Sequence, residues 1–327
     1  MERRVHDMAA QGARVQGAER VRAAQGIRGA GSPQPTPRPA MRDLNSPAFL
    51  EKFAERQQRP VDAVPTHLPS LNRMCGDDGG GIGLAKGWFV TVGANPGFGK
   101  SAMALNLTSW ALKHGHAVGY ISLEMTAAQL AARHYAIYTN EPIVGLERGR
   151  FNLEAWDRVQ ERLGDLPPVY VPETVGGAWE DVASFVRECY DAGCRWFVLD
   201  YLQLVQAGDE ENINRAITTI TTDLRNWCVN NGATVVALSQ FNRTTSADYT
   251  QTPRCQGLWG GMILEASSDV VLLLDHSRYK REDHLARTWL VIDKNRHGWT
   301  GELPVLWDYR ALRMFEGKED EIGDWPE

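Results

Sequence analysis

The chain has 327 residues, of which 43% are hydrophobic and 23% are charged, a composition typical of globular proteins rather than disordered or fibrous ones. No apolar run approaches the roughly 18–20 residues of a membrane span, and the polar, arginine-rich N-terminus does not resemble a secretory signal. Five scattered cysteines favour a reduced, cytoplasmic protein over a disulfide scaffold, and Cys189 and Cys194 are expected to pack rather than to bind zinc.

Charge is spread unevenly along the chain, although the net charge is only −6. Residues 1–42 carry eight arginines against three acids, whereas residues 316–327 carry six acids against one lysine. The body between them is acidic, so the sequence predicts no broad basic surface for a nucleic acid. Any contact with a phosphate backbone would have to lie in a local groove or channel.

The two ends of the chain differ in composition from the part between them. Residues 1–40 are rich in Ala, Gly, Gln and Arg and end in a proline-rich run, so we expect a disordered tail. The tail is either an arm that binds nucleic acid or a translated leader ahead of Met41, and the sequence leaves both open. The expected divisions after the tail are a linker helix and extended arm over 41–63, a folded domain over 64–315 and an acidic tail over 316–327.

From residue 88 onward, short apolar strands alternate with helices, which is typical of a parallel α/β sheet. Residues 71–87, just before this alternation, are expected to form a polar, glycine-rich connection. The predicted strands are Trp88–Gly93, Ala117–Ser122, Arg195–Leu199, Thr234–Ser239, Asp269–Leu274, Ala286–Ile292 and Leu303–Trp307, the last two suiting an antiparallel hairpin. The predicted helices are Lys100–Lys113, Thr126–Tyr138 with a Thr126/Gln129 capping box, Glu180–Asp191 and Ile213–Asn230.

A phosphate-binding loop lies between the first strand and the first helix of this alternation. Gly97 and Gly99 let the backbone N–H groups approach triphosphate oxygens at a helix N-terminus. Lys100 supplies a charge for the β- and γ-phosphates, and the Ser101 hydroxyl is a predicted Mg²⁺ ligand. The strict pattern begins with glycine, but Ala94 stands there. The predicted nucleotide-binding residues are Ala94, Asn95, Pro96, Gly97, Phe98, Gly99, Lys100 and Ser101.

Polar side chains follow three of the other predicted strands. Glu124, Asp200 and Gln240 each come just after an apolar strand. Because open α/β sheets place their chemistry at the carboxyl ends of the strands, we expect the three to converge on the phosphates. Asp200 suits a second Mg²⁺ contact, Glu124 suits orienting and polarising the attacking water, and Gln240 suits sensing the γ-phosphate.

Seven short motifs follow one another along the chain: Val64–Thr66, Ala94–Ser101, Ser122–Thr126, Leu199–Leu204, Leu238–Arg243, Leu264–Val271 and Lys294–Gly298. Together they resemble the C-terminal ATPase domain of DnaB-type replicative helicases over about Val64–Arg313. The resemblance implies a RecA-like P-loop NTPase fold: a mostly parallel central sheet flanked by helices, with a C-terminal antiparallel hairpin. It also implies an ATP- and Mg²⁺-dependent DNA helicase active in replication.

The resemblance implies ring hexamers that move on single-stranded DNA and hydrolyse ATP at subunit interfaces. Glu124 would be the catalytic carboxylate, while Lys294 and Arg296 would act on the γ-phosphate held by the neighbouring subunit. Both cations lie on the loop of the predicted hairpin, where they can project past the sheet edge. The helix over Asn45–Arg59 would dock on the next subunit.

Two departures from the family pattern limit the resemblance. Only residues 1–63 precede the matched region, so contacts that the family makes through its helical N-terminal domain, such as primase binding, are not carried over. In addition, Trp259 and Gly260 stand where the family usually has an Arg-Glu pair at the DNA backbone. Trp259 could stack on a base and the glycine-rich loop could bind phosphate, or these loops simply cover the sheet edge. The acidic run Asp209–Glu211 is unfavourable for binding DNA. The basic residues that are candidates for DNA contact are Arg215, Arg243 and Arg254.

Three functions fit these motifs. The first is an ATP-driven helicase ring, and the second is a recombination or repair ATPase of the RecA/RadA kind that remodels DNA without processive unwinding. The third is a nucleotide switch that no longer engages DNA, which the acidic and uncharged loops favour.

Overall fold

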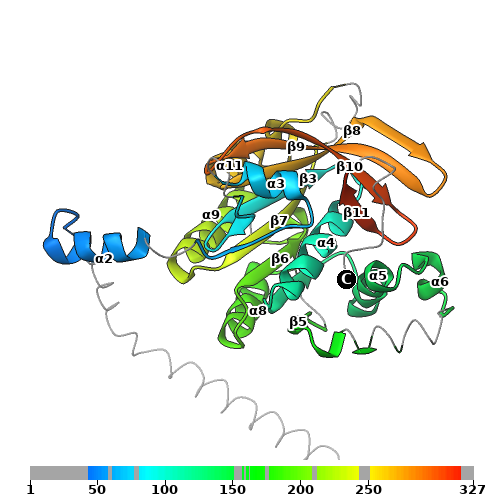
Figure 1. Ribbon diagram of the computed structural model, residues 1–327, viewed down its shortest axis with the longest axis horizontal. Coiled ribbons are helices and arrows are strands. Elements are labelled where there is room, and N and C mark those ends of the chain that lie inside the picture. Colours follow the sequence, from blue (N-terminus) through cyan, green and yellow to red (C-terminus); the bar gives the residue numbers. More distant parts are fainter. Residues whose placement is uncertain are drawn as a thin grey trace, which may run out of the picture. The chain divides into compact units, whose positions relative to one another are not determined.

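The computed structural model describes residues 43–57, 61–76, 81–150, 157, 160–161, 163–173, 177–207, 212–242 and 251–317, apart from the side chains of residues 276 and 278–282 (Figure 1). The predicted N-terminal tail, the acidic run Asp209–Glu211, Arg243 and nearly all of the predicted acidic tail lie outside the described residues. Contacts divide the chain into two units, residues 1–60 and residues 61–327.

The described part of the first unit holds helix α2 (Pro47–Gln57). Ser46 caps it, since its hydroxyl accepts a hydrogen bond from the Phe49 N–H at 3.3 Å, and Pro47 occupies the first helical position, where its missing N–H costs nothing. Leu50 and Phe53 lie one turn apart on this helix, and both side chains are more than half exposed. The helix therefore carries an apolar stripe that is more than half exposed.

The second unit is built on one large sheet whose strand order is β11-β10-β9-β8-β3-β7-β6-β4-β5 (Figure 1). Neighbours from β8 to β5 are parallel, and β8 to β11 pair antiparallel in succession. This arrangement confirms the predicted mostly parallel sheet with an antiparallel hairpin, β9–β10, near the C-terminus. The strand bounds are Phe89–Ala94 (β3), Val118–Ser122 (β4), Val169–Tyr170 (β5), Trp196–Asp200 (β6), Thr234–Gln240 (β7), Val270–Glu282 (β8), Leu285–Asn295 (β9), Gly301–Asp308 (β10) and Arg313–Glu316 (β11).

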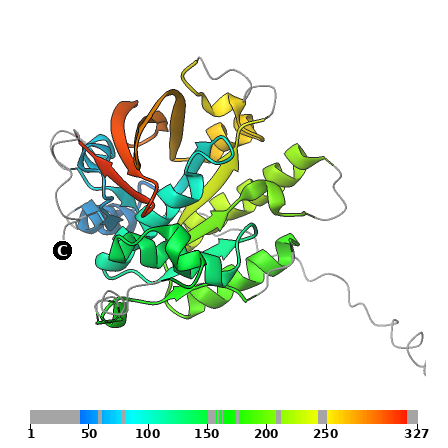
Figure 2. The same ribbon diagram turned by 90° about the vertical axis from the view of Figure 1, so that its right-hand side faces the viewer.

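Helices cover both faces of this sheet (Figures 1 and 2). One hydrophobic core contains residues of α3, α4 and α5, and a second contains residues of α8, α9 and α11. Both also contain strand residues, so the sheet separates the two cores. Among the described residues, no helix is long and apolar enough to cross a lipid bilayer. The helix bounds are Pro69–Met74 (α3), Lys100–Lys113 (α4), Ala127–Thr139 (α5), Ile143–Glu147 (α6), Trp179–Asp191 (α8), Ile213–Asn231 (α9) and Gly261–Ser267 (α11).

The central strand β3 explains why its sequence is a continuous apolar run. All six of its residues are buried, with Val90 and Val92 in the first core and Phe89 in the second. Successive side chains of a strand point to opposite faces, so a strand covered on both sides has no polar alternation. Cys189 and Cys194 are buried in the second core.

The prediction of a polar connection over residues 71–87 is wrong. The segment forms most of α3 and contributes strand β2 (Leu84–Ala85), which pairs with β1 (Ala63–Val64). Leu71, Cys75 and Leu84 are all fully buried in the first core. These three buried residues are separated in the sequence by polar residues and glycines, so no hydrophobic pattern predicted them. Pro69 is a signal for the start of a helix and could have indicated α3.

His67 lies between β1 and α3 with 8% of its surface exposed, and neither ring nitrogen has a hydrogen-bond partner among the described residues. Burial lowers the pKa of this imidazole to about 3, whereas the unfolded chain keeps a pKa of about 6.5. The unfolded state therefore binds the proton first as pH falls, and the stability contributed by neutral His67 is lost between these two values.

We expect acidification from pH 7 to pH 5 to cost the protein about 2 kcal/mol of unfolding free energy through His67. The variant His67→Leu removes the titrating group and leaves no buried polar atom, so it should lose that part of the pH dependence. Urea denaturation of both proteins at the two pH values measures the difference. An identical pH dependence in both would contradict the assignment.

Candidate active site

The loop between β3 and α4 forms the base of the site. The N–H of Phe98 donates to the Asn95 carbonyl at 3.2 Å, and the N–H of Met103 donates to the Gly99 carbonyl at 2.8 Å, which starts α4. Gly97 and Gly99 have φ angles of 80° and 83°, in the left-handed region that favours glycine. The sequence needs both glycines to turn the chain from the strand into the helix.

The two glycines of this turn have different surroundings. A Cβ on Gly99 would lie 2.8 Å from the Trp307 ring of β10, so the C-terminal strands pack directly beneath the loop. A Cβ on Gly97 would meet nothing within 4 Å, which leaves the outer side of the loop open. The first turn of α4 has no acidic residue and no side-chain cap, so its N–H groups and positive dipole end remain available to an anion.

Lys100 connects the loop to the carboxylates predicted from the strand ends. Its side chain is only 7% exposed, and its Nζ lies 3.5 Å from Asp200 Oδ1 and 3.7 Å from Glu124 Oε2. Asp200 is fully buried at the end of β6, and Glu124, half exposed, follows β4. The structure thus brings three of the predicted site residues together at the carboxyl edge of the parallel strands.

Two tyrosines complete this cluster. The Tyr120 hydroxyl donates to Asp200 Oδ2 at 3.2 Å, and the ring of Tyr201 lies 4.4 Å from Lys100 Nζ in a cation–π contact. Burial, followed by the adjacent Asp200 charge, raises the pKa of Tyr120 well above its usual value, so Tyr120 stays a hydrogen-bond donor. The peptide bond between Asp200 and Tyr201 is cis.

Gln240 ends β7 in register with Ala94, the last residue of β3. Its backbone N–H donates to Gln203 Oε1 at 3.4 Å, and Gln203 Nε2 donates to the Ser239 hydroxyl at 2.8 Å. The carbonyl of Gln240 in turn accepts the N–H of Trp259 at 3.0 Å. Gln240 therefore lies between the phosphate loop and the Trp259 segment.

Lys294 and Arg296 lie at the other edge of the sheet. Arg296 N–H donates to the Asp269 carbonyl, and Asp269 N–H donates to that of Phe89, the first residue of β3. The phosphate loop starts at Ala94, the last residue of β3 and five residues after Phe89. At 3.3 Å per residue, the two ends of this strand are about 16 Å apart. The two cations are therefore far from the phosphate loop of their own chain.

The C-terminal end of α11 holds both cations. The Nζ of Lys294 donates to the carbonyls of Glu265 and Ala266, and the guanidinium of Arg296 also donates to that of Ala266. The partial negative charge at a helix C-terminus favours cations. Burial, and then the neighbouring Arg296, lowers the pKa of Lys294. Arg296 stays exposed.

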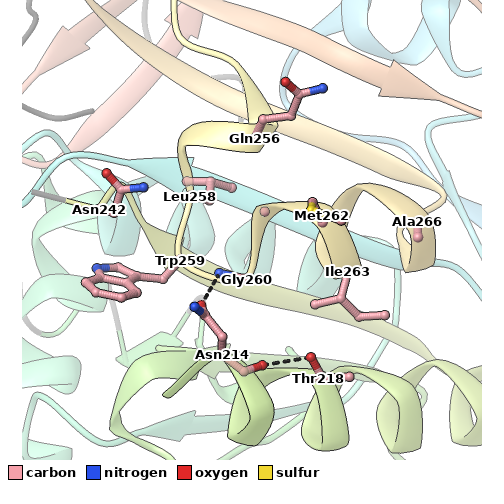
Figure 3. A pocket seen from close by; sticks show the side chains of 11 residues that line it. Asn214, Thr218, Asn242, Gln256, Leu258, Trp259, Gly260, Met262, Ile263 and Ala266 are labelled. Carbon is pink, nitrogen blue, oxygen red and sulfur yellow. Dashed lines mark hydrogen bonds between the residues drawn. The ribbon is translucent and has the colours of Figure 1, made fainter. Parts of the chain in front are cut away.

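Two of the three basic residues proposed for DNA contact, Arg215 and Arg254, lie in the described part of the chain. Arg254 forms an ion pair with Asp293 at 2.8 Å, and Arg215 is exposed on α9. A groove lies between α9 and α11, with Trp259 at its side, and none of the described residues that line it carries a charge (Figure 3).

The residues around the loop fit a nucleoside triphosphate with Mg²⁺. Asp200 Oδ1 is buried and has no hydrogen-bond donor among the described residues, and the left-handed Gly97 leaves the loop open. This oxygen has Lys100 Nζ at 3.5 Å as its ion-pair partner but makes no hydrogen bond among the described residues. Such a buried carboxylate oxygen suits a hydrated divalent cation, and Ser101 at the start of α4 offers the hydroxyl ligand. Fold and site together define a P-loop nucleotide-binding protein.

Sequence reasoning missed Tyr120, Tyr201 and Gln203 as parts of the site. Tyr120 stands in a buried strand, two residues before Ser122, and its hydroxyl was the one signal of a polar partner. Tyr201 and Gln203 belong to the motif after Asp200, but their contacts depend on how that turn folds. Spacing along the chain does not give such contacts.

The chain belongs to the DnaB-like helicase C-terminal domain family, whose model matches residues 63–316. It is 27% identical over 271 residues to the replicative DNA helicase DnaB of Geobacillus stearothermophilus, covering 80% of this chain and 58% of the relative. It is 29% identical over 246 residues to a probable plasmid replicative DNA helicase of Chlamydia psittaci, covering 73% and 52%. The chain thus spans between half and three fifths of these relatives.

Solved structures show the same fold. An isolated ATPase domain superimposes with a TM-score of 0.71 at 20% identity, covering 85% of this chain and all of the other. A DnaB-like replicative helicase, solved in a study of its interactions with primase, gives 0.69 at 20% identity, covering 85% of this chain and 68% of the other. These likenesses confirm the predicted RecA-like ATPase fold.

We expect Lys100→Ala to weaken ATP binding about 10- to 150-fold, because a charge-assisted hydrogen bond contributes about 1.5–3 kcal/mol. Titration with a fluorescent ATP analogue measures the loss, and circular dichroism checks that the variant is folded. Lys113→Ala, at the other end of α4, is the matched control and should bind normally. Unchanged affinity in folded Lys100→Ala would rule out the assigned phosphate site.

Proposed function

We propose that this chain is the motor domain of a DnaB-type DNA helicase. It hydrolyses ATP at subunit interfaces of a homo-oligomeric ring, a hexamer as in the family, and the ring moves on single-stranded DNA and unwinds duplex DNA in replication. The observation that carries the proposal is the separation of charges: Lys100 lies with Asp200 and Glu124 at one sheet edge, and Lys294 and Arg296 lie at the other.

Within one subunit, each side chain of the site has a distinct task. The backbone of the loop and Lys100 bind and orient the β- and γ-phosphates, and Ser101 and Asp200 hold the cation. Mg²⁺, when bound, neutralises charge that develops on the phosphate oxygens. Glu124 is half exposed, so it can accept a proton from, and orient, the attacking water. Gln240, beside the loop, can respond to the γ-phosphate.

A neighbouring subunit completes the site. Contacts that join one sheet edge to the opposite edge of the next copy are head-to-tail, and such contacts close into rings. They would bring Lys294 and Arg296 of one subunit to the phosphate loop of another. An arginine supplied in this way contributes about 10³ to 10⁵ in rate, so hydrolysis would depend on assembly. The apolar stripe of α2, with Leu50 and Phe53, is proposed to dock on the adjacent subunit.

The proposal predicts an ATPase that single-stranded DNA stimulates at low salt, where phosphate contacts are strongest, and a helicase that unwinds a tailed duplex. Glu124→Gln is the matched control, because it should bind ATP normally yet hydrolyse it about 10² to 10⁴ times more slowly. Phosphate release and strand separation are the measurements. ATP hydrolysis without unwinding, with filaments in micrographs, would favour a recombination ATPase instead.

Mixing two inactive variants tests the shared site. Lys100→Ala lacks the phosphate contact but keeps Arg296, whereas Arg296→Ala keeps the phosphate loop. We expect each to be inactive alone and an equimolar mixture to recover about one quarter of wild-type ATPase activity, since one interface in four then combines both intact halves. A mixture as inactive as its components would show that both residues act within one subunit.

A further inference from the structure

An open groove of about 630 Å³ lies between α9 and α11 (Figure 3). Sites for small ligands typically enclose about 300–1,000 Å³, so the groove is large enough for one. Its floor includes the glycine-rich turn at Gly260, and the indole of Trp259 stands at its side (Figure 3). No residue of the groove takes part in the nucleotide site described above.

The described residues that line the groove carry both apolar and polar side chains. Trp259 is half-buried, and the Met262 side chain is 85% exposed. Amide and hydroxyl groups accompany these two, from Asn214, Asn242, Gln256 and Thr218. Among the lining residues that the structure describes, none carries a charge.

The backbone around Trp259 is fixed on both sides. Its N–H donates to Gln240 and its carbonyl accepts the Ser239 hydroxyl at 3.4 Å. The next residue, Gly260, has a φ of 70° and donates its N–H to Asn214 Oδ1 at 3.2 Å. A Cβ on Gly260 would lie 2.5 Å from Ile217, so glycine is required there. The backbone that carries the indole is thus fixed before any ligand arrives, which lowers the entropic cost of binding.

We propose that this groove binds an unpaired nucleobase of single-stranded DNA, stacked on Trp259. Every base has a π-face that an aromatic ring can stack on, and its edge carries donors and acceptors that side-chain amides match. The described lining offers a phosphate no cation, whereas it offers a base an aromatic face and side-chain amides. The base site rests on the proposed function, and it replaces the charged phosphate contact that the family pattern places at Trp259 and Gly260.

Base stacking and phosphate binding differ in what they require of the DNA. An abasic oligomer keeps the phosphates but offers nothing to stack, whereas oligothymidylate of equal length offers both. Removing an indole changes no charge, so the slope of log affinity against log salt should stay the same; removing a phosphate-binding cation would reduce that slope by about 0.7.

The test measures binding of the full chain to both oligomers by fluorescence anisotropy, with Mg²⁺ and a non-hydrolysable ATP analogue, over a range of salt concentrations. We expect wild type to prefer oligothymidylate. Trp259→Ala should weaken this binding about 5- to 150-fold, from the usual 1–3 kcal/mol of a base–aromatic stack, without changing the salt slope or the affinity for the abasic oligomer. Trp259→Phe should keep most of the preference.

Trp110→Ala is the matched control, since Trp110 is also half-buried but lies on α4, on the other face of the sheet. It should bind both oligomers as wild type does. Equal wild-type affinity for the two oligomers, or an equal loss of both in Trp259→Ala, overturns the base site while leaving the helicase proposal intact. Wild type that binds neither oligomer overturns both proposals.

Discussion

The buried contact between Lys100 and Asp200 is the interaction on which the site depends. A lysine 7% exposed and a carboxylate with no exposed surface are costly to remove from water, so each needs the other. Their 3.5 Å separation leaves Asp200 Oδ1 without a hydrogen-bond donor among the described residues. The end of β6, the glycine turn and the Tyr120 hydroxyl together position this pair at the phosphate loop.

The parallel sheet determines which charges can cooperate within a chain. Strand ends at one edge bring Glu124, Asp200 and Gln240 to the phosphate loop, because parallel strands all finish there. The antiparallel strands after β8 return the chain to the opposite edge, where Lys294 and Arg296 are held. In the proposed ring, a second copy of the chain would bring the cations of that opposite edge to the phosphate loop.

The sequence predicted correctly those features that depend on one residue type and its near neighbours in the chain. The glycines, Lys100 and the Thr126/Gln129 capping box follow from backbone geometry and helix ends, and the box is present. The sequence did not predict features that depend on contacts between distant segments. Helix α3 is one of them, because the buried residues that hold it are separated by polar residues. The carbonyls of α11 that hold Lys294 and Arg296 leave no mark in the sequence, because any residue supplies a carbonyl.

Helix α11 joins the two regions that the sequence treats as separate motifs. Its seven residues span about 10 Å at 1.5 Å per residue. Its first turn lines the groove beside Trp259, and its last carbonyls hold both Lys294 and Arg296. The groove and the two cations therefore share one short helix within a single chain.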